Sequence, residues 1–152
     1  MAIRNIIQLG DPVLRKKSFA VEAISPKIIQ LLDDMKDTLN KAKGAGLAAV
    51  QVGVLRRVFI VDVDEGYFEF INPEIISQKG EQYGPEGCLS VKGKWGDVKR
   101  PNQVVVKATD RNGKQFKLKA EGFFARAVCH EYDHLDGIVY VDKADNLRSE
   151  ID

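Results

Sequence analysis

The sequence predicts a compact α+β domain, in which antiparallel or mixed β-sheets surround a central helix and a further helix lies near the N-terminus. Three observations support this: helical periodicity over residues 26–43, strand-like segments between residues 58 and 120, and a second helical pattern over residues 122–135. A helix, then strands, then a helix is typical of α+β proteins rather than of repeated βαβ units. The length of 152 residues suits a single domain, 1–152.

The first helix is predicted for residues 26–43. Ser25 suits the N-cap and Pro26 suits the first helical position. The apolar residues are spaced by four and three positions and form one stripe, namely Ile28, Leu32, Met35, Leu39 and Ala42. Gly44 offers a C-terminal stop. Residues 44–53 that follow are rich in glycine and alanine, so another group can approach the backbone closely there.

Strands are predicted after this segment, beginning with an apolar, buried one at residues 58–63. Further strands are expected at 67–71, 74–82, 102–110 and 115–120. Asn112-Gly113 indicates a hairpin between the last two. Residues 84–90 are predicted to be a loop, because glycine and proline interrupt them. The helix at 122–135 ends before Gly137, and a short strand is expected at 138–141.

The strongest chemical signal is the sequence His130-Glu131-Tyr132-Asp133-His134. Histidines four positions apart lie on one face of a helix and can bind the same ion. Glu131 follows the first histidine and can reach a water on that ion. The alternative is a solvated helix with two surface histidines. These two histidines are the only ones in the chain.

A third metal ligand is predicted at Cys88, because a thiolate is a strong ligand for divalent transition metals. The alternative is a buried free cysteine. Cys88, His130 and His134 together leave one position open for water, which is typical of a catalytic centre, whereas structural zinc sites have four protein ligands. On a helix, Cys129 points about 100° away from His130, so it is a poor fourth ligand. We predict that its thiol is buried and packs in the core.

Three motifs, taken in order, resemble those of the peptide deformylase family. That family carries GxGLAAxQ, EGCLS and HExDH, and this chain has GAGLAAVQ at 44–51, EGCLS at 86–90 and HEYDH at 130–134. The resemblance extends to the opening DPVLR at 11–15. One departure is Cys129, because the family usually has glutamine before the first histidine.

The resemblance implies an enzyme that removes the N-formyl group from the N-terminal formyl-methionine of newly made polypeptides and releases formate. It implies that a metal-bound water attacks the formyl carbonyl while Glu131 takes and returns the proton. The side-chain amide of Gln51 and the backbone N–H of Leu89 would stabilise the negative oxygen. It also implies one divalent ion, with Fe²⁺ as the physiological metal and Zn²⁺, Ni²⁺ or Co²⁺ as substitutes.

Four residues are predicted to bind the substrate. Gly46 would leave its backbone free to pair with an extended peptide; the alternative is a tight turn. Leu47 and Ala127 would give apolar surface. Arg126 lies one helical turn before His130, and we expect its stem to line the pocket and its charge to lie at the rim. The alternative is an Arg126 turned to solvent.

Other polar residues are expected to support the site. Asp133 either orients a ligand or pairs with a basic residue, for which the resemblance suggests Arg100; a solvated carboxylate is the alternative. Glu86 and Ser90 are expected to make loop-shaping hydrogen bonds. Gln51 has a simpler alternative as a polar residue that ends a strand.

The net charge of +1 gives no sign of a polyanionic partner recognised through bulk charge, so direct nucleic-acid recognition is not expected. No apolar run is long enough to span a bilayer and no signal peptide is evident, so we expect a cytoplasmic protein. Nascent formyl-methionyl peptides, with transient ribosome association, are the expected partners. Three rival functions are an HExxH endopeptidase, a binding domain stabilised by a structural metal, and a thiol hydrolase with Cys88 as nucleophile.

Overall fold

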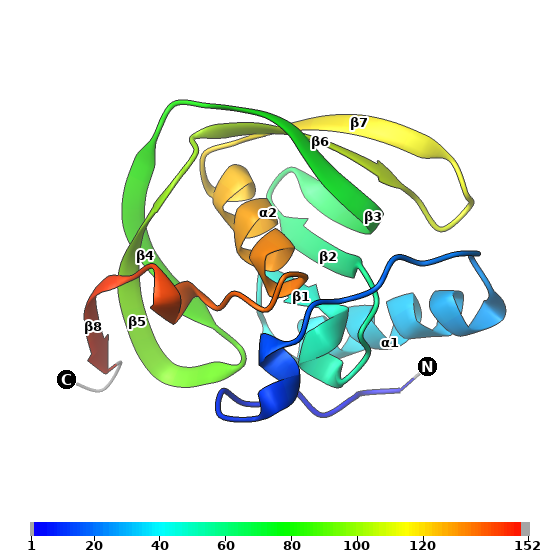
Figure 1. Ribbon diagram of the computed structural model, residues 1–152, viewed down its shortest axis with the longest axis horizontal. Helices are drawn as coiled ribbons and strands as arrows, with labels where there is room; N and C mark the ends of the chain where they lie inside the picture. The colour runs from blue at the N-terminus through cyan, green and yellow to red at the C-terminus, as the bar shows by residue number, and fades with distance from the viewer. Residues whose placement is uncertain (1, 150–152) are drawn as a thin grey trace.

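The computed structural model describes residues 2–149, and in this part of the chain two α-helices pack with two antiparallel sheets (Figure 1). This agrees with the predicted α+β class. The helices are α1 (Pro26–Ala42) and α2 (Phe123–His134). The larger sheet has the order β1-β2-β3-β6-β7 and the smaller one β4-β5-β8. The strands are β1 (Gly46–Ala48), β2 (Val58–Val63), β3 (Gly66–Lys79), β4 (Gln82–Cys88), β5 (Val91–Arg100), β6 (Gln103–Thr109), β7 (Gln115–Glu121) and β8 (Asp145–Ser149). Short 3-10 helices are η1 (Pro12–Arg15), η2 (Ala49–Val52) and η3 (Tyr140–Asp142).

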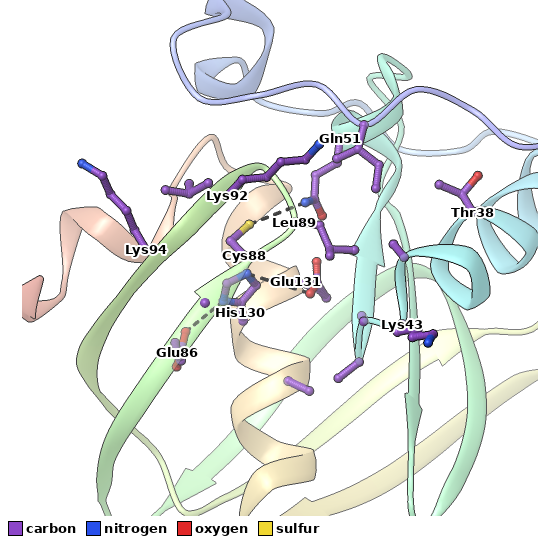
Figure 2. A pocket seen from close by; sticks show the side chains of 18 of the residues that line it. Thr38, Lys43, Gln51, Glu86, Cys88, Leu89, Lys92, Lys94, His130 and Glu131 are labelled. Atoms are coloured by element: carbon purple, nitrogen blue, oxygen red, sulfur yellow. Dashed lines mark hydrogen bonds and ion pairs between the residues drawn. The ribbon is translucent and has the colours of Figure 1, made fainter. Parts of the chain in front are cut away.

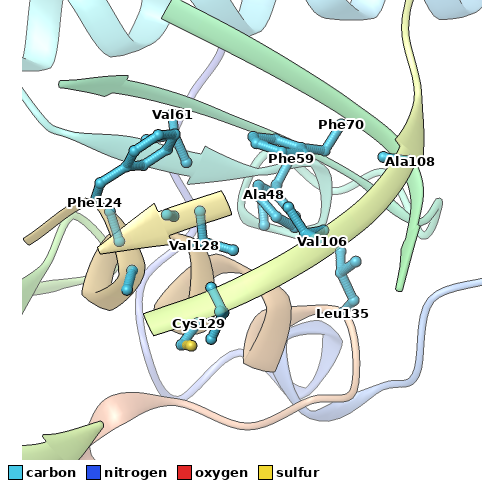
Figure 3. Packing of buried hydrophobic residues seen from close by; sticks show 14 of the residues in the cluster. Ala48, Phe59, Val61, Phe70, Val106, Ala108, Phe124, Val128, Cys129 and Leu135 are labelled. Carbon is cyan, nitrogen blue, oxygen red and sulfur yellow. The ribbon is translucent and has the colours of Figure 1, made fainter. Parts of the chain in front are cut away.

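Strand β2 is buried on both faces over its first four residues, because each helix covers one side of the larger sheet. Its side chains alternate: Val58 and Ile60 pack in the cluster that contains the apolar stripe of α1, while Phe59 and Val61 pack against α2 (Figure 3). The ring of Phe59 stacks on that of Phe70 from β3, with centroids 4.7 Å apart. A continuous apolar run is the expected sequence pattern for such a strand.

The end of α1 positions the glycine-rich segment. The helix ends at Ala42, one residue before the predicted boundary, and Lys43 adopts a left-handed conformation with φ of 57°. The N–H of Gly44 then donates to the carbonyl of Leu39 at 3.3 Å. This reversal directs residues 46–48 into the sheet as β1, an edge strand that the sequence pattern did not predict.

The predicted loop at 84–90 is wrong for its first part, because β4 continues to Cys88 and pairs with β5. Pro85 is tolerated there because β4 is an edge strand, where a missing N–H costs no ladder bond. The strands predicted at 67–71 and 74–82 form the single strand β3, which has irregular register after Ile71. The strand predicted at 138–141 is also wrong, since η3 begins at Tyr140 and β8 comes later.

The smaller sheet is joined to α2 through its own apolar cluster. Val98 of β5 is fully buried in this cluster with Val139 and Tyr140. The ring of Tyr140 stacks on that of His130 at 5.9 Å, and its hydroxyl donates to the carbonyl of Lys94 at 3.0 Å. These contacts hold the end of β4 beside α2. Among residues 2–149, no helix is long and apolar enough to cross a membrane.

Candidate metal centre and active-site cleft

Cys88, His130 and His134 converge although 42 residues separate the cysteine from the first histidine. Cys88 ends β4, and both histidines project from the last turns of α2. The ligand atoms of the three residues all lie within 4.8 Å of one another. The Sγ atom of Cys88 lies 3.4 Å from Nε2 of His134. Figure 2 shows Cys88 and His130 facing the same space. The structure therefore brings together the three predicted ligands.

Glu86 fixes the orientation of His130. One of its carboxylate oxygens lies 2.8 Å from Nδ1 of His130. Burial opposes the charge on Glu86, but hydrogen bonds from Arg100 and His130 hold the pKa of Glu86 well below its usual value. An ionised carboxylate only accepts hydrogen bonds, so Nδ1 of His130 is the donor. The lone pair of Nε2 then points into the site, as a metal ligand requires.

The set of donor atoms fits a divalent transition metal. One sulfur and two imidazole nitrogens suit zinc, iron, nickel or cobalt. Burial and the neighbouring His130 lower the pKa of His134 well below its usual value, which favours the neutral form that binds metals. Burial also opposes charge on His130, but Glu131, Cys88 and Glu86 outweigh it and raise its pKa. A bound cation would therefore replace a proton on His130.

Glu131 lies beside the three ligand residues and is almost completely buried. Its Oε2 atom is 4.0 Å from Nε2 of His130, and within residues 2–149 its Oε1 atom has no hydrogen-bond partner. Burial raises the pKa of Glu131 to about 7. A carboxylate with a pKa near neutrality can both accept and return a proton at physiological pH.

Gln51 is held from two sides in η2. Its Oε1 atom accepts the N–H of Ala48 at 2.9 Å, and its Nε2 atom donates to Oγ of Ser90 at 3.0 Å. The same Nε2 lies 3.6 Å from Sγ of Cys88. The bond to Ala48 fixes which end of the amide faces the site. Ser90, which we expected to shape a loop, instead orients this amide.

Leu89 is held by the N-terminal segment, a contact that no pattern in the sequence predicted. Gln8 donates from Nε2 to the carbonyl of Leu89 at 3.0 Å, and the N–H of Leu9 donates to the carbonyl of Ser90 at 2.7 Å. These bonds position the peptide units that follow Cys88. The one signal for this contact in the sequence is Gln8, a polar residue that lies between apolar neighbours.

A cleft of about 1140 Å³ opens over these residues. Its lining includes Gly46, Arg126 and Ala127, three of the four residues predicted to bind substrate. The prediction for Leu47 is wrong, because its side chain is fully buried in the apolar cluster that contains the α1 stripe. Side chains alternate along a strand, so β1 can present residue 46 to the cleft only by turning residue 47 to the other face.

Arg126 does not hold its charge at the rim or in solvent, as we had expected. Its Nη1 atom donates to Oε2 of Glu86 at 2.6 Å and to the carbonyls of Gly84 and Val98. The side chain is only 7% exposed. The buried carboxylate of Glu86 attracts the guanidinium and explains its position. Periodicity along the helix cannot reveal this contact, because Glu86 lies on another element.

Asp133 and Arg100 form the pair that the resemblance implied. Nη1 of Arg100 donates to Oδ2 of Asp133 at 2.6 Å, and Nζ of Lys143 lies 3.0 Å from the same oxygen. Arg100 also donates twice to Glu86, at 2.8 and 2.9 Å. Cys129 is buried in the core, where burial raises its pKa to about 11, so the thiol stays protonated.

Known proteins match this chain over nearly its whole length. The model of the polypeptide deformylase family matches residues 3–150. The peptide deformylase of Caldicellulosiruptor bescii is 56% identical over 99% of this chain and 90% of its own length. That of Lachnoclostridium phytofermentans is 55% identical over 99% of this chain and 94% of its own length.

The chain is also similar to solved structures of peptide deformylases. The crystal structure of the Legionella pneumophila peptide deformylase has a TM-score of 0.91 at 41% identity, covering 95% of this chain and 87% of that one. The Ehrlichia chaffeensis peptide deformylase in complex with actinonin has a TM-score of 0.93 at 36% identity, covering 96% and 91%. On the family match and these identities, the chain belongs to the polypeptide deformylase family.

Proposed function

We propose that this chain is a metal-dependent hydrolase that removes the formyl group from the N-terminal formyl-methionine of newly made polypeptides. The observation that carries the proposal is the convergence of Cys88, His130 and His134 beside Glu131 at the cleft. Membership of the family supports the substrate class. We infer that residues 1–152 form one catalytic domain, with α2 as the central helix that bears the HExxH residues.

One divalent ion held by Cys88, His130 and His134 would supply Lewis-acid activation of water and of the formyl carbonyl. Three protein ligands are the number found in catalytic rather than structural zinc sites. The family resemblance favours Fe²⁺ as the physiological metal. Zn²⁺, Ni²⁺ and Co²⁺ suit the same ligand atoms.

Glu131 is the proposed acid and base. Its Oε1 atom has no hydrogen-bond partner among residues 2–149, so it is free to accept the proton of the attacking water. The carbon–nitrogen bond of the formamide then breaks, and Glu131 returns the proton to the departing amine. The products are formate and a free methionine amino group. A pKa of about 7 suits both steps near neutral pH.

Gln51 and Leu89 are the proposed donors to the oxygen that becomes negative in this reaction. The bond from the N–H of Ala48 keeps the amide of Gln51 turned so that Nε2 faces Cys88. The carbonyl of Leu89 is held by Gln8, which fixes the adjoining backbone. Donors that are already oriented stabilise the charge without reorganisation.

The substrate peptide is proposed to pair with β1. This strand lies at the edge of the larger sheet, and its residue Gly46 faces the cleft. An extended peptide can add to such an edge through main-chain hydrogen bonds. Ala127 and Phe123, both in the lining, offer apolar surface to the methionine side chain.

The test combines metal analysis with formate release on one anaerobically purified sample, using formyl-Met-Ala-Ser. Glu131→Ala should keep the metal and lose formate release, while Glu74→Ala, an exposed glutamate of β3, should keep both. Full activity of Glu131→Ala would contradict the assigned role. Formate release in the presence of a strong chelator would favour a thiol hydrolase, and cleavage of internal peptide bonds would favour an endopeptidase.

A further inference from the structure

We propose that the mouth of the cleft selects formyl-methionyl peptides with acidic side chains in the residues that follow methionine. The selecting groups are four lysines, here called the lysine rim: Lys41, Lys43, Lys92 and Lys94. This inference rests on the proposed deformylase function and adds a substrate preference to it.

The lysine rim lies on two opposite sides of the metal ligands. Lys41 belongs to the last turn of α1 and Lys43 follows that helix, whereas Lys92 and Lys94 belong to β5. Figure 2 shows Lys43 on one side of the cleft and Lys92 and Lys94 on the other, with Glu131 between them. A peptide that leaves the metal centre along the cleft would pass between two cationic walls.

Within residues 2–149, no acidic side chain in the lining offsets the lysine rim at the mouth. The two carboxylates that line the cleft, Glu86 and Glu131, are buried at its base, and Glu86 already binds two arginines. Among residues 2–149, lysines with an ion pair within 4.0 Å are Lys99, Lys119 and Lys143; none belongs to the lysine rim. The described residues of the mouth therefore present positive charge to an incoming peptide.

The size of the cleft allows contacts beyond the methionine. Its volume of about 1140 Å³ exceeds the range of roughly 300–1,000 Å³ that is typical of small-molecule pockets. The rim lysines are exposed, so they attract charge over distances within a Debye length, about 10 Å at 0.1 M salt. Attraction of this kind acts on binding and encounter rather than on the chemical step, and salt weakens it.

The experiment compares three formylated peptides with amidated C-termini: formyl-Met-Ala-Asp-Asp, formyl-Met-Ala-Ser-Ser and formyl-Met-Ala-Lys-Lys. We measure kcat/KM from formate release by the holoenzyme at low and at high salt. Exposed charge pairs contribute roughly 0.2–1 kcal/mol, which corresponds to about 1.4- to fivefold per pair. We expect the acidic peptide to exceed the neutral one by about two- to tenfold at low salt. We also expect the basic peptide to fall below the neutral one, and both differences to shrink at high salt.

A matched pair of double variants isolates the lysine rim. Lys43→Gln/Lys92→Gln should lower the acidic-to-neutral ratio of kcat/KM toward one. Lys114→Gln/Lys117→Gln removes the same charge from the β6–β7 hairpin, away from the cleft lining, and should leave the ratio as in the parent. Thermal unfolding of both variants checks that each is folded.

Two results would overturn the inference without touching the proposed function: a ratio near one in the parent enzyme, or a ratio that Lys43→Gln/Lys92→Gln leaves unchanged. Inhibition by a short single-stranded RNA, relieved in this variant while peptide charge has no effect, would assign the lysine rim to RNA and also overturn it. Absence of formate release from the neutral peptide would instead contradict the deformylase function itself.

Discussion

Gly46 and Glu131 are in such close contact that residue 46 has no room for a side chain. A β-carbon built on Gly46 would lie 2.6 Å from Oε2 of Glu131 and 2.9 Å from its Cγ. Because β1 and α2 meet at this point, the glycine allows the carboxylate to reach the metal ligands.

Gly46→Ala should displace the carboxylate of Glu131 and lower kcat by about 100-fold, which is the typical cost of a misplacement of about 1 Å at a reacting centre. Metal content should stay unchanged, because the three atoms nearest to the added β-carbon all belong to Glu131 and not to a ligand residue. The measurement is formate release together with metal analysis. Gly84→Ala is the control, since its β-carbon would meet Arg126 at an ordinary 3.5 Å. Full kcat in Gly46→Ala would show that Glu131 tolerates another position.

Glu86→Gln should weaken metal binding by about 10- to 100-fold, the usual effect of removing a partner that orients a metal-bound histidine. The amide carries no charge and cannot hold Nδ1 of His130 as a carboxylate does. Competition between the protein and a chromophoric chelator for Co²⁺ measures the change. Glu81→Gln, on an exposed glutamate, should bind Co²⁺ like the parent. Equal affinity in Glu86→Gln would contradict the orienting role.

Arg126→Met should lower the free energy of unfolding by about 3 kcal/mol, because it removes one partner of a buried ion pair. Arg100 still neutralises Glu86 in this variant, which keeps the loss near the lower end of the usual range. Urea unfolding measures the effect. Lys119→Met, which removes an exposed pair with Glu121, should cost less than about 1 kcal/mol. A similarly small loss for Arg126→Met would mean that this contact contributes little.

Asp34 links the N-terminal segment to α1, and its contribution to stability should depend on pH. The carboxylate accepts the N–H of Ala2 at 2.8 Å, Nε2 of Gln30 at 2.7 Å and Nε of Arg4 at 2.9 Å. Burial opposes its charge, but these hydrogen bonds outweigh burial and lower the pKa of Asp34. A group with a lowered pKa in the folded state stabilises the protein above its unfolded pKa, which is about 3.9.

Asp34→Asn should therefore reduce the free energy of unfolding at pH 6, and the difference from the parent should shrink as the pH falls below about 4. Urea unfolding at a series of pH values measures it. Asp64→Asn changes an exposed aspartate in a turn and should show no such trend. A difference for Asp34→Asn that stays constant from pH 6 to pH 3 would contradict the linkage.

Much of the architecture followed from local patterns. The 4,3 spacing from Ile28 to Ala42 predicted α1 to within one residue, and Asn112-Gly113 predicted the β6–β7 hairpin. Both depend on interactions between residues close in the chain. By contrast, β4 was missed because Pro85 and two glycines disfavour a strand locally, and only pairing with β5 makes one.

In the site, too, the features that depend on local spacing were predicted, and those that depend on distant partners were not. The spacing of His130 and His134 is a helical property, so their common face could be read from the chain. Glu86 was underestimated and Arg126 misplaced because their partners lie 44 and 40 residues away. Leu47 was misassigned because the face on which a strand residue lies depends on the register of β1 with β2.

By itself, the sequence determined the types of the chemical groups and their spacing along each element: two imidazoles one turn apart, a glutamate beside them and a thiol in a separate motif. It also determined a net charge of +1. Only the tertiary structure decided that two guanidiniums meet one buried carboxylate, and that two lysines at the end of α1 and two lysines of β5 line one cleft. The physical reason is that charge and coordination act through space, and the distances between segments are set by how the two sheets pack on α2.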